Sequence, residues 1–182
     1  MKLNNQEIRN CIYGGSFNSL LKHLDSNDDW RRLNKMSKGN SYRFAKQEII
    51  LRLFAFHDGH KKYDGHLAKF LNSYMHEHRE APEKFIADKK KKLFEETVQI
   101  VFEKIFSKKA PSKLSITVLE SMLVGVSKSI PYLKEKTATD LHKRFEQLTS
   151  NQEFSDDALR EGLAKRHRVI ARLDAAINIF SK

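Results

Sequence analysis

Apolar residues along the 182-residue chain recur mostly at spacings of three and four positions. This is the period of a helix that is buried on one side, and no convincing run shows the strict alternation of a strand. Glycine and proline, which favour turns and interrupt helices and strands, number only 7 and 3. The pattern predicts helices at about 6–13, 17–24, 28–36, 46–58, 66–76, 82–106, 114–126, 139–148, 156–163 and 165–180. The expected fold class is all-α.

Two of these segments have almost no polar face. Residues 46–58 carry seven apolar side chains between Ile49 and Phe56, and residues 114–126 have the same character. A helix that is apolar all round must be surrounded by protein. We therefore expect a multi-helix bundle of about eight to ten helices around two central apolar helices. A chain of this length fits a single domain, 1–182.

Capping residues support several of the predicted helix ends. Asn4 and Asn5 can cap the first helix, and Gly14-Gly15 can stop it, because glycine accepts a left-handed backbone. Asp28 and Asp29 suit the start of the third helix. Pro82 stands where proline is tolerated, in a first helical turn. Residues 107–113 (SKKAPSK) form the clearest loop.

Composition places the chain with globular proteins, since 40% of residues are apolar and 31% are charged. Thirty-four Lys and Arg against 23 Asp and Glu give a net charge of +11. Such an excess favours polyanionic partners, although a solvated lysine-rich surface or a compositional bias explains it equally well. A single Cys11, no apolar leader and no run of roughly 20 apolar residues predict a cytoplasmic protein that does not cross a membrane.

Basic residues fall into groups along the predicted helices. Lysines four apart on one helix stack along one face, so a ridge of them can meet the phosphates of double-stranded DNA. Glu95, Glu96 and Glu103 interrupt this ridge, and a solvated face is the simpler alternative. The predicted nucleic-acid-binding residues are Lys84, Lys89, Lys90, Lys91, Lys92, Arg166, Arg168 and Arg172.

The first helix carries an unusual set of polar residues, Gln6, Glu7, Arg9 and Asn10. Gln6 faces Asn10 at four-residue spacing. From the residues alone, these side chains are best explained as a polar cap with ion pairs to Glu48 or Arg52 of the central helix, because structural ion pairs are commoner than functional sites.

The sequence gives little support for a metal site, a catalytic nucleophile or a phosphate-binding loop. The eight histidines lack the convergent spacing of zinc ligands, Cys11 has no nucleophile signature around it, and no glycine-rich phosphate loop occurs. The sequence predicts no catalytic residue, no metal site and no cofactor.

Three blocks of sequence resemble one known family. They are residues 3–18 (LNNQEIRNCIYGGSFN), residues 43–55 (RFAKQEIILRLFA), and YDGH at 63–66 followed by FLNSYM at 70–75. In this order and spacing they resemble the C-terminal helical lobe of the GmrSD-type restriction endonuclease N-terminal domain family, which is ParB-like and nuclease-associated. From about residue 82 onward only the helical pattern is similar.

The resemblance implies a role in bacterial restriction and phage defence. Family members carry an Asp-Gly-Gln-Gln-Arg motif in a preceding ParB-like lobe, and many are joined to an HNH nuclease. This chain shows neither motif, so the family's activity is not carried over to it. The expected function is a non-catalytic lobe that contacts nucleic acid and docks to a ParB-like lobe or nuclease subunit. The alternatives are a pure protein-interaction module and half of an NTPase or nuclease site completed in trans. The matching positions, as a lobe interface, are Gln6, Glu7, Arg9, Asn10, Arg43, Glu48, Arg52 and Asn72.

Overall fold

The computed structural model describes residues 3–35, 45–79, 84–160 and 162–181, with the side chains of the longest helix described from residue 87. These residues form eleven α-helices, eight of them seven residues or longer, and no strand. The all-α prediction is confirmed. The helices are α1 (Asn5–Ile12), α2 (Ser16–Asp25), α3 (Asp28–Leu33), α4 (Ala45–Gly59), α5 (Leu67–His78), α6 (Lys84–Gln99), α7 (Ile116–Lys128), α8 (Ile130–Lys134), α9 (Ala138–Ser150), α10 (Asp156–Arg160) and α11 (Arg166–Ser181). Short 3-10 turns are η1 (His60–Lys62) and η3 (Gln152–Phe154), and η2 (Ile100–Ile105) is a π-helical segment.

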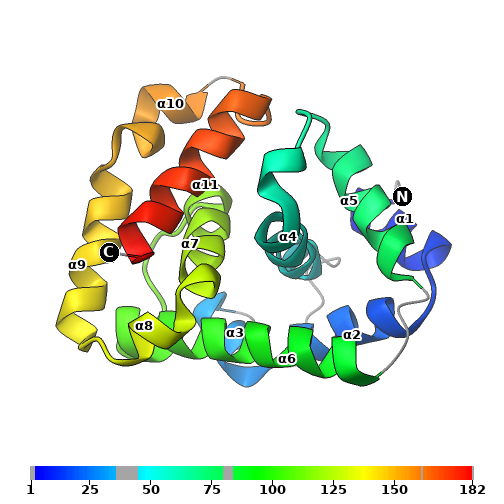
Figure 1. The fold of residues 1–182 in the computed structure, drawn as a ribbon, viewed down its shortest axis with the longest axis horizontal. Helices are drawn as coiled ribbons and strands as arrows, with labels where there is room; N and C mark the ends of the chain where they lie inside the picture. Colours follow the sequence, from blue (N-terminus) through cyan, green and yellow to red (C-terminus); the bar gives the residue numbers. More distant parts are fainter. Residues whose placement is uncertain (1–2, 36–44, 80–83, 161, 182) are drawn as a thin grey trace.

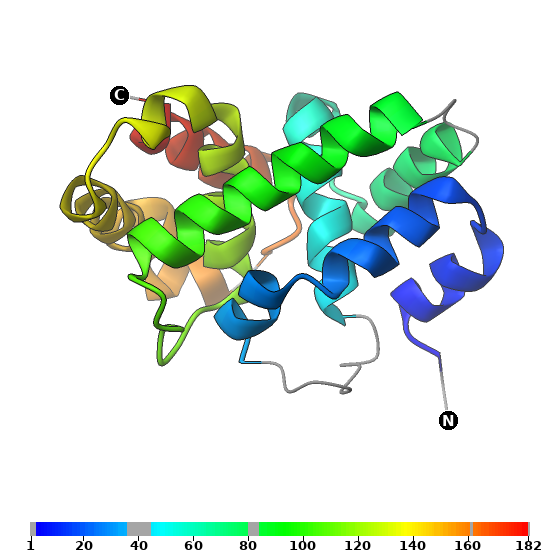
Figure 2. The same cartoon turned by 90° about the horizontal axis from the view of Figure 1, so that it is seen from below.

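Helices α4 and α7 pack against each other in the middle of the molecule (Figure 1). Both are buried over nearly their whole circumference, as the sequence predicts. Helices α1, α2 and α5 lie on one side of this pair, and α8 to α11 lie on the other. Helix α6 crosses the lower side, and Figure 2 shows it running alongside α2 and α3. The core therefore joins the two halves through α4, α6 and α7.

Capping explains where the first helices begin and end. The Asn4 side chain accepts from the backbone N–H of Glu7, and the Glu7 carboxylate accepts from that of Asn4, which is a complete capping box. Gly15 follows with φ of 137°, where a Cβ atom would stand 2.8 Å from the carbonyl oxygen of Arg79. A larger residue there would both strain the backbone and collide with it.

The closest helix packing is between α7 and α11. At Gly125 a Cβ atom would lie 2.7 Å from the carbonyl oxygen of Ala176 and 2.9 Å from the Phe180 ring. Glycine therefore allows the two backbones to approach. Residues Val169, Leu173, Ala176 and Phe180 fill the buried face of α11, as its periodicity predicts.

Several boundaries differ from the prediction. Helix α8 was not predicted, because its five residues are too few to show a period, although Pro131 stands in its first turn. The long helix changes to π-helical geometry at Ile100, and α10 ends at Arg160. The predicted third-helix end at Met36 and Pro82 lie outside the described residues. No helix of the described part has the length and apolar character needed to cross a membrane.

Candidate functional site

A polar cluster lies between α1, α2 and α4. Gln6 and Arg9 on α1 are only 1% and 3% exposed. Gln6 donates to Asn10 Oδ1 at 3.1 Å, and Asn10 and Gln47 exchange a reciprocal pair of side-chain amide hydrogen bonds, both 3.1 Å. Gln47 also donates to Asn18 Oδ1 at 3.3 Å. The inner face of α1 is thus polar, and its groups bond to one another.

Ion pairs extend this cluster toward α7. Arg9 Nη1 lies 2.7 Å from Glu48 Oε2, and Arg9 Nε donates to Asn72 of α5 at 2.9 Å. Arg52 Nη2 lies 2.7 Å from Glu48 Oε1, and Arg52 Nη1 lies 3.0 Å from Glu120 Oε2. The chain Arg9–Glu48–Arg52–Glu120 therefore links α1, α4 and α7.

The two carboxylates of this chain differ in their electrostatics. Burial acts to raise the pKa of Glu48, but Arg52 and Arg9 together outweigh it and hold the pKa below its usual range. Burial is stronger at Glu120, where it raises the pKa against the pull of Arg52. The ionised form of Glu48 is therefore favoured, and that of Glu120 is not.

The structure brings most of the predicted interface residues together. Gln6, Arg9, Asn10, Glu48, Arg52 and Asn72 share this network, Glu7 serves the capping box, and Arg43 lies outside the described residues. The pairing with Glu48 is the structural interpretation considered from the sequence. Asn18, Gln47 and Glu120 were missed, because polar residues at single positions of apolar helices give no distinctive pattern.

The outer face of α1 is apolar. Leu3, which precedes the helix, is 56% exposed, Ile8 and Ile12 on the helix are 41% and 57% exposed, and Cys11 is also exposed. Among the described residues only two other large apolar side chains are as open, Ile116 and Leu163. Helix α1 thus buries two polar side chains, Gln6 and Arg9, and exposes apolar ones, so its outer face is a candidate interaction surface.

The predicted nucleic-acid-binding residues do not form one surface. Helix α6 lies at the lower side of the molecule, and the start of α11 lies at the upper side (Figure 1). The exposed members are Lys89, Lys92 and Arg166; Lys91 lies 3.9 Å from Glu95, and Arg168 donates to the carbonyl of Ala158. Lys84 has no described side chain.

Two of the predicted nucleic-acid-binding residues are buried. Lys90 is 9% exposed, pairs with Asp58, and lies over the rings of Phe54 and Tyr74. Arg172 is 3% exposed and donates to the carbonyl of Leu163 at 2.6 Å. Neither side chain is available to a phosphate backbone, since each faces the core.

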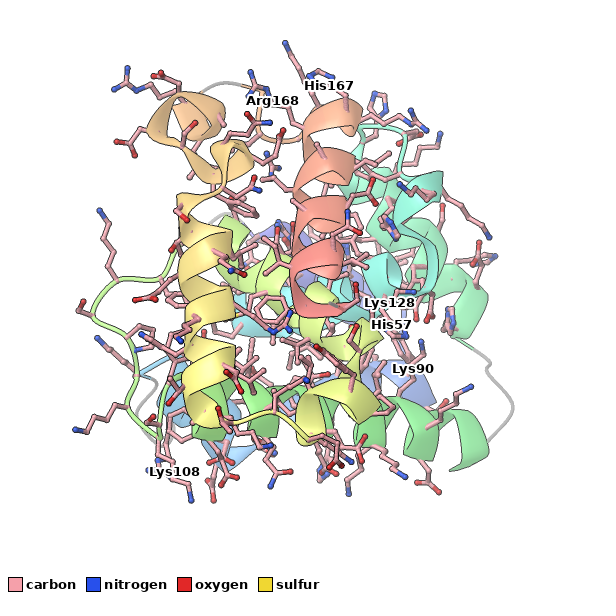
Figure 3. All side chains as sticks on the ribbon, turned by 60° about the vertical axis from the view of Figure 1, so that its left-hand side comes forward. His57, Lys90, Lys108, Lys128, His167 and Arg168 are labelled. Carbon is pink, nitrogen blue, oxygen red and sulfur yellow. The ribbon has the colours of Figure 1, made fainter. Side chains whose placement is uncertain are left out.

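A different basic cluster forms where α4, α6 and α7 meet. Figure 3 shows His57, Lys90 and Lys128 together on one side of the molecule. His57 Nδ1 lies 2.8 Å from Ser127 Oγ. Burial, followed by the charge of Lys128, lowers the pKa of His57 to about 4; Asp58 opposes this shift, and Lys90 and Lys89 add smaller lowering effects. His57 is therefore neutral at physiological pH.

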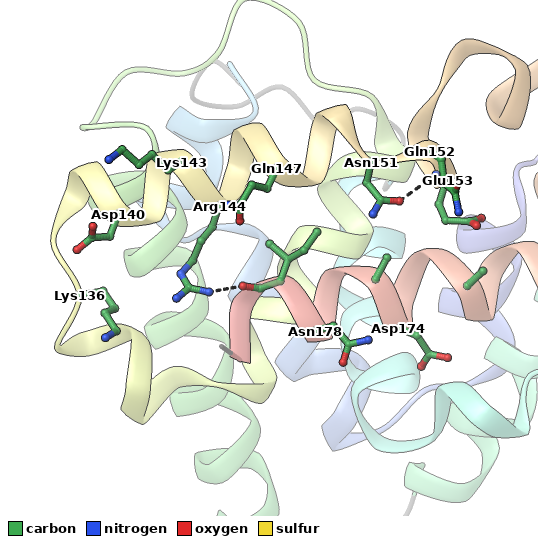
Figure 4. Close-up of a pocket in the computed structure, with 13 residues that line it drawn as sticks. Lys136, Asp140, Lys143, Arg144, Gln147, Asn151, Gln152, Glu153, Asp174 and Asn178 are labelled. Atoms are coloured by element: carbon green, nitrogen blue, oxygen red, sulfur yellow. Dashed lines mark hydrogen bonds between the residues drawn. The ribbon is translucent and has the colours of Figure 1, made fainter.

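Two of the hollows on the described surface are lined by several charged residues. The larger, about 990 Å³, is a groove between α9 and α11 (Figure 4), with Lys136, Lys143 and Arg144 near one end and Glu153 and Asp174 near the other. The smaller, about 300 Å³, lies between α4 and α5 and is lined by residues that include Asp58, Phe70 and Tyr74. No group of three or more potential metal ligands occurs among the described residues.

Comparisons with known proteins assign no family and no function to this chain. No family model, no curated protein and no solved structure matches this chain. The family resemblance of the three sequence blocks accordingly stays a prediction.

Proposed function

We propose that this chain is the helical lobe of a restriction-type defence effector, with no catalytic centre of its own, and that it docks to a ParB-like lobe through the outer face of α1. The inverted amphipathic character of α1 carries this proposal. Leu3, Ile8 and Ile12 expose apolar surface while Gln6 and Arg9 are buried. The partner is identified from the resemblance of residues 3–18 to the GmrSD-type family, because in that family a ParB-like lobe comes directly before this segment.

The size of the apolar face limits how the partner is held. Three apolar side chains are far fewer than the roughly 20–30 residues per side of a stable interface between free proteins. The partner must therefore be covalently joined or make further contacts, since tethering raises its effective concentration. The network behind α1 keeps the helix in a fixed orientation, which lowers the entropic cost of docking.

The test is binding of the purified chain to the ParB-like lobe of a GmrSD-type protein, measured by calorimetry and light scattering. Ile8→Asp/Ile12→Asp should lower the affinity at least tenfold, because burying two carboxylates in an apolar contact is unfavourable. The control is Ile116→Asp, at a position 52% exposed on α7. Equal binding by all three proteins, or preference for a nuclease subunit or a second copy, contradicts the proposal.

Nucleic-acid contact is the second part of the proposed function. The net charge of +11 and the exposed side chains of Lys89, Lys92 and Arg166 favour it. Contacts to phosphates alone position a protein without reading bases, so binding should show no sequence preference. The logarithm of affinity should fall with the logarithm of salt concentration by about 0.9 per contact. A flat salt response excludes this part and leaves the docking function.

A further inference from the structure

The basic cluster around His57 is assembled from three helices. His57 comes from the last turn of α4, Lys89 and Lys90 come from α6, and Lys128 ends α7. Lys89 and Lys128 are exposed, and neither forms an ion pair within the described part of the chain. Of the charged groups that act most strongly on His57, Lys128, Lys90 and Lys89 are positive and Asp58, which already pairs with Lys90, is negative. Positive charges therefore outnumber negative ones among these groups.

Lys90 is fixed within this cluster. Its ammonium group donates to Asp58 Oδ2, which also accepts from Tyr74 Oη at 2.6 Å. It also lies 5.3 Å from the centre of the Phe54 ring. A cation held in this way keeps a fixed position beside His57, because its ion pair with Asp58 and the aromatic rings prevent it from moving toward solvent.

The hydrogen bonds of His57 determine which ring nitrogen is open. Ser127 Oγ donates its only proton to the carbonyl of Val124 at 2.8 Å. With that proton directed to Val124, the 2.8 Å contact with His57 is satisfied when Nδ1–H donates to Ser127 Oγ. In the neutral ring this leaves a lone pair on Nε2, which has no hydrogen-bond partner in the described structure. A proton added to Nε2 would convert it into a donor without disturbing Ser127.

We infer that His57, Lys89 and Lys128, supported by Lys90, form a binding site for a phosphate group, and that the phosphate binds together with one proton taken up from solvent by His57 Nε2. The bound anion offsets the lysine charges that disfavour the imidazolium, which then donates Nε2–H to a phosphate oxygen. The phosphate we assign is that of a nucleic-acid backbone, and in this respect the inference rests on the nucleic-acid contact proposed above.

The competing explanation is structural. Helices α4 and α7 both end near this cluster, at Gly59 and Lys128, and lysines commonly neutralise the partial negative charge of helix C-termini. That explanation requires no anion and no change in the protonation of His57. Proton uptake therefore distinguishes the two.

The first experiment follows the titration of the His57 ring by nuclear magnetic resonance, with sulfate as a probe that stays a dianion over the pH range in which this ring titrates. His57→Gln identifies its signals. We expect saturating sulfate to raise the His57 midpoint from about 4 by at least about one pH unit, which corresponds to tenfold tighter sulfate binding to the protonated form. Sulfate affinity should accordingly increase as the pH falls from about 7 to about 5.

Matched variants test the lysines. Lys89→Ala/Lys128→Ala should abolish the sulfate-induced rise, whereas Lys92→Ala, at an exposed lysine on the same helix that is not among the strongest charges acting on His57, should leave it unchanged. The first two side chains are solvent-exposed, so the double variant should keep the fold. A sulfate response absent from the native chain, or equal in the double variant, overturns the inference in favour of helix-end neutralisation.

A short DNA duplex forms the second arm. Lys89→Ala/Lys128→Ala should reduce the slope of log affinity against log salt by about 0.9 for each phosphate that the variant no longer neutralises. If sulfate shifts His57 but the duplex binds the native and double-variant proteins alike, the phosphate site stands and its assignment to nucleic acid is wrong. If the duplex binds without any shift of His57, nucleic-acid contact stands and this site is wrong.

Discussion

Replacing Glu48 by glutamine removes the charge at which two guanidinium groups meet. Glu48 accepts from Arg9 Nη1 at 2.7 Å and from Arg52 Nη2 and Nε at 2.7 and 3.2 Å. Removing one partner of a buried ion pair costs about 3–5 kcal/mol. Arg9 keeps its bond to Asn72, Arg52 keeps Glu120, and the glutamine keeps one acceptor oxygen, so we expect the lower end, about 3 kcal/mol.

Urea unfolding at pH 7 measures this loss, with an unchanged dependence on urea as the sign that the native fold persists. For a domain of this size the melting temperature should fall by roughly 6–12 °C. The control is Glu95→Gln, which weakens a pair with N···O distance 3.9 Å between two side chains more than 40% exposed, and should cost less than about 1 kcal/mol.

The pH dependence provides an independent check. The folded-state pKa of Glu48 lies below its ordinary value, so its contribution is present above that value and disappears as the pH falls toward the folded pKa. The difference in stability between the native chain and Glu48→Gln should therefore shrink below about pH 4. A loss smaller than about 1 kcal/mol at pH 7, or a difference that grows on acidification, would refute the ionic role of Glu48.

Three further substitutions have distinct expected outcomes. Glu120→Gln should cost less than Glu48→Gln at pH 7 in the same urea assay, because burial disfavours the ionised form of Glu120. Gly125→Ala should lower the unfolding free energy by about 1–3 kcal/mol, since its Cβ would meet the Ala176 carbonyl. Arg172→Met should change both stability and DNA affinity little: Nη1 is buried without a partner, and a side chain this buried contacts no phosphate.

The helical architecture was predictable because periodicity and capping are local properties. The apolar circumference of residues 46–58 and 114–126 predicted the two helices that the structure places at the centre. The Asn4 cap and the stop at Gly14-Gly15 agree with the observed ends of α1. Helix α8 and the π-helical geometry from Ile100 depend on how the chain packs, and neither has a periodic signature.

The polar network was predictable only in part. The contact of Gln6 with Asn10 follows from helix spacing, and a pairing of α1 with Glu48 or Arg52 follows from the need to neutralise a charge on a buried helix. The inversion of α1 was not predicted. Ile8 and Ile12 are four residues apart and look like an ordinary core stripe, and only the packing shows that the opposite, polar face is the buried one.

Helix geometry could have predicted which of the basic residues are buried. Successive residues of a helix are about 100° apart, so the run Lys89–Lys92 cannot lie on one face. Lys90 stands four residues before Phe94, on the stripe predicted to face the core, and Arg172 stands three residues after Val169 on another such stripe. Their burial could therefore have been predicted from the sequence.

The contact of His57 with Ser127 and its proximity to Lys128 could not be predicted, because 70 residues separate His57 from Ser127 and no local pattern relates them. A binding site of this kind can be recognised only from the packing of α4, α6 and α7. The charge run groups Lys89 with its neighbours in sequence, whereas the proposed site groups it with His57 and Lys128.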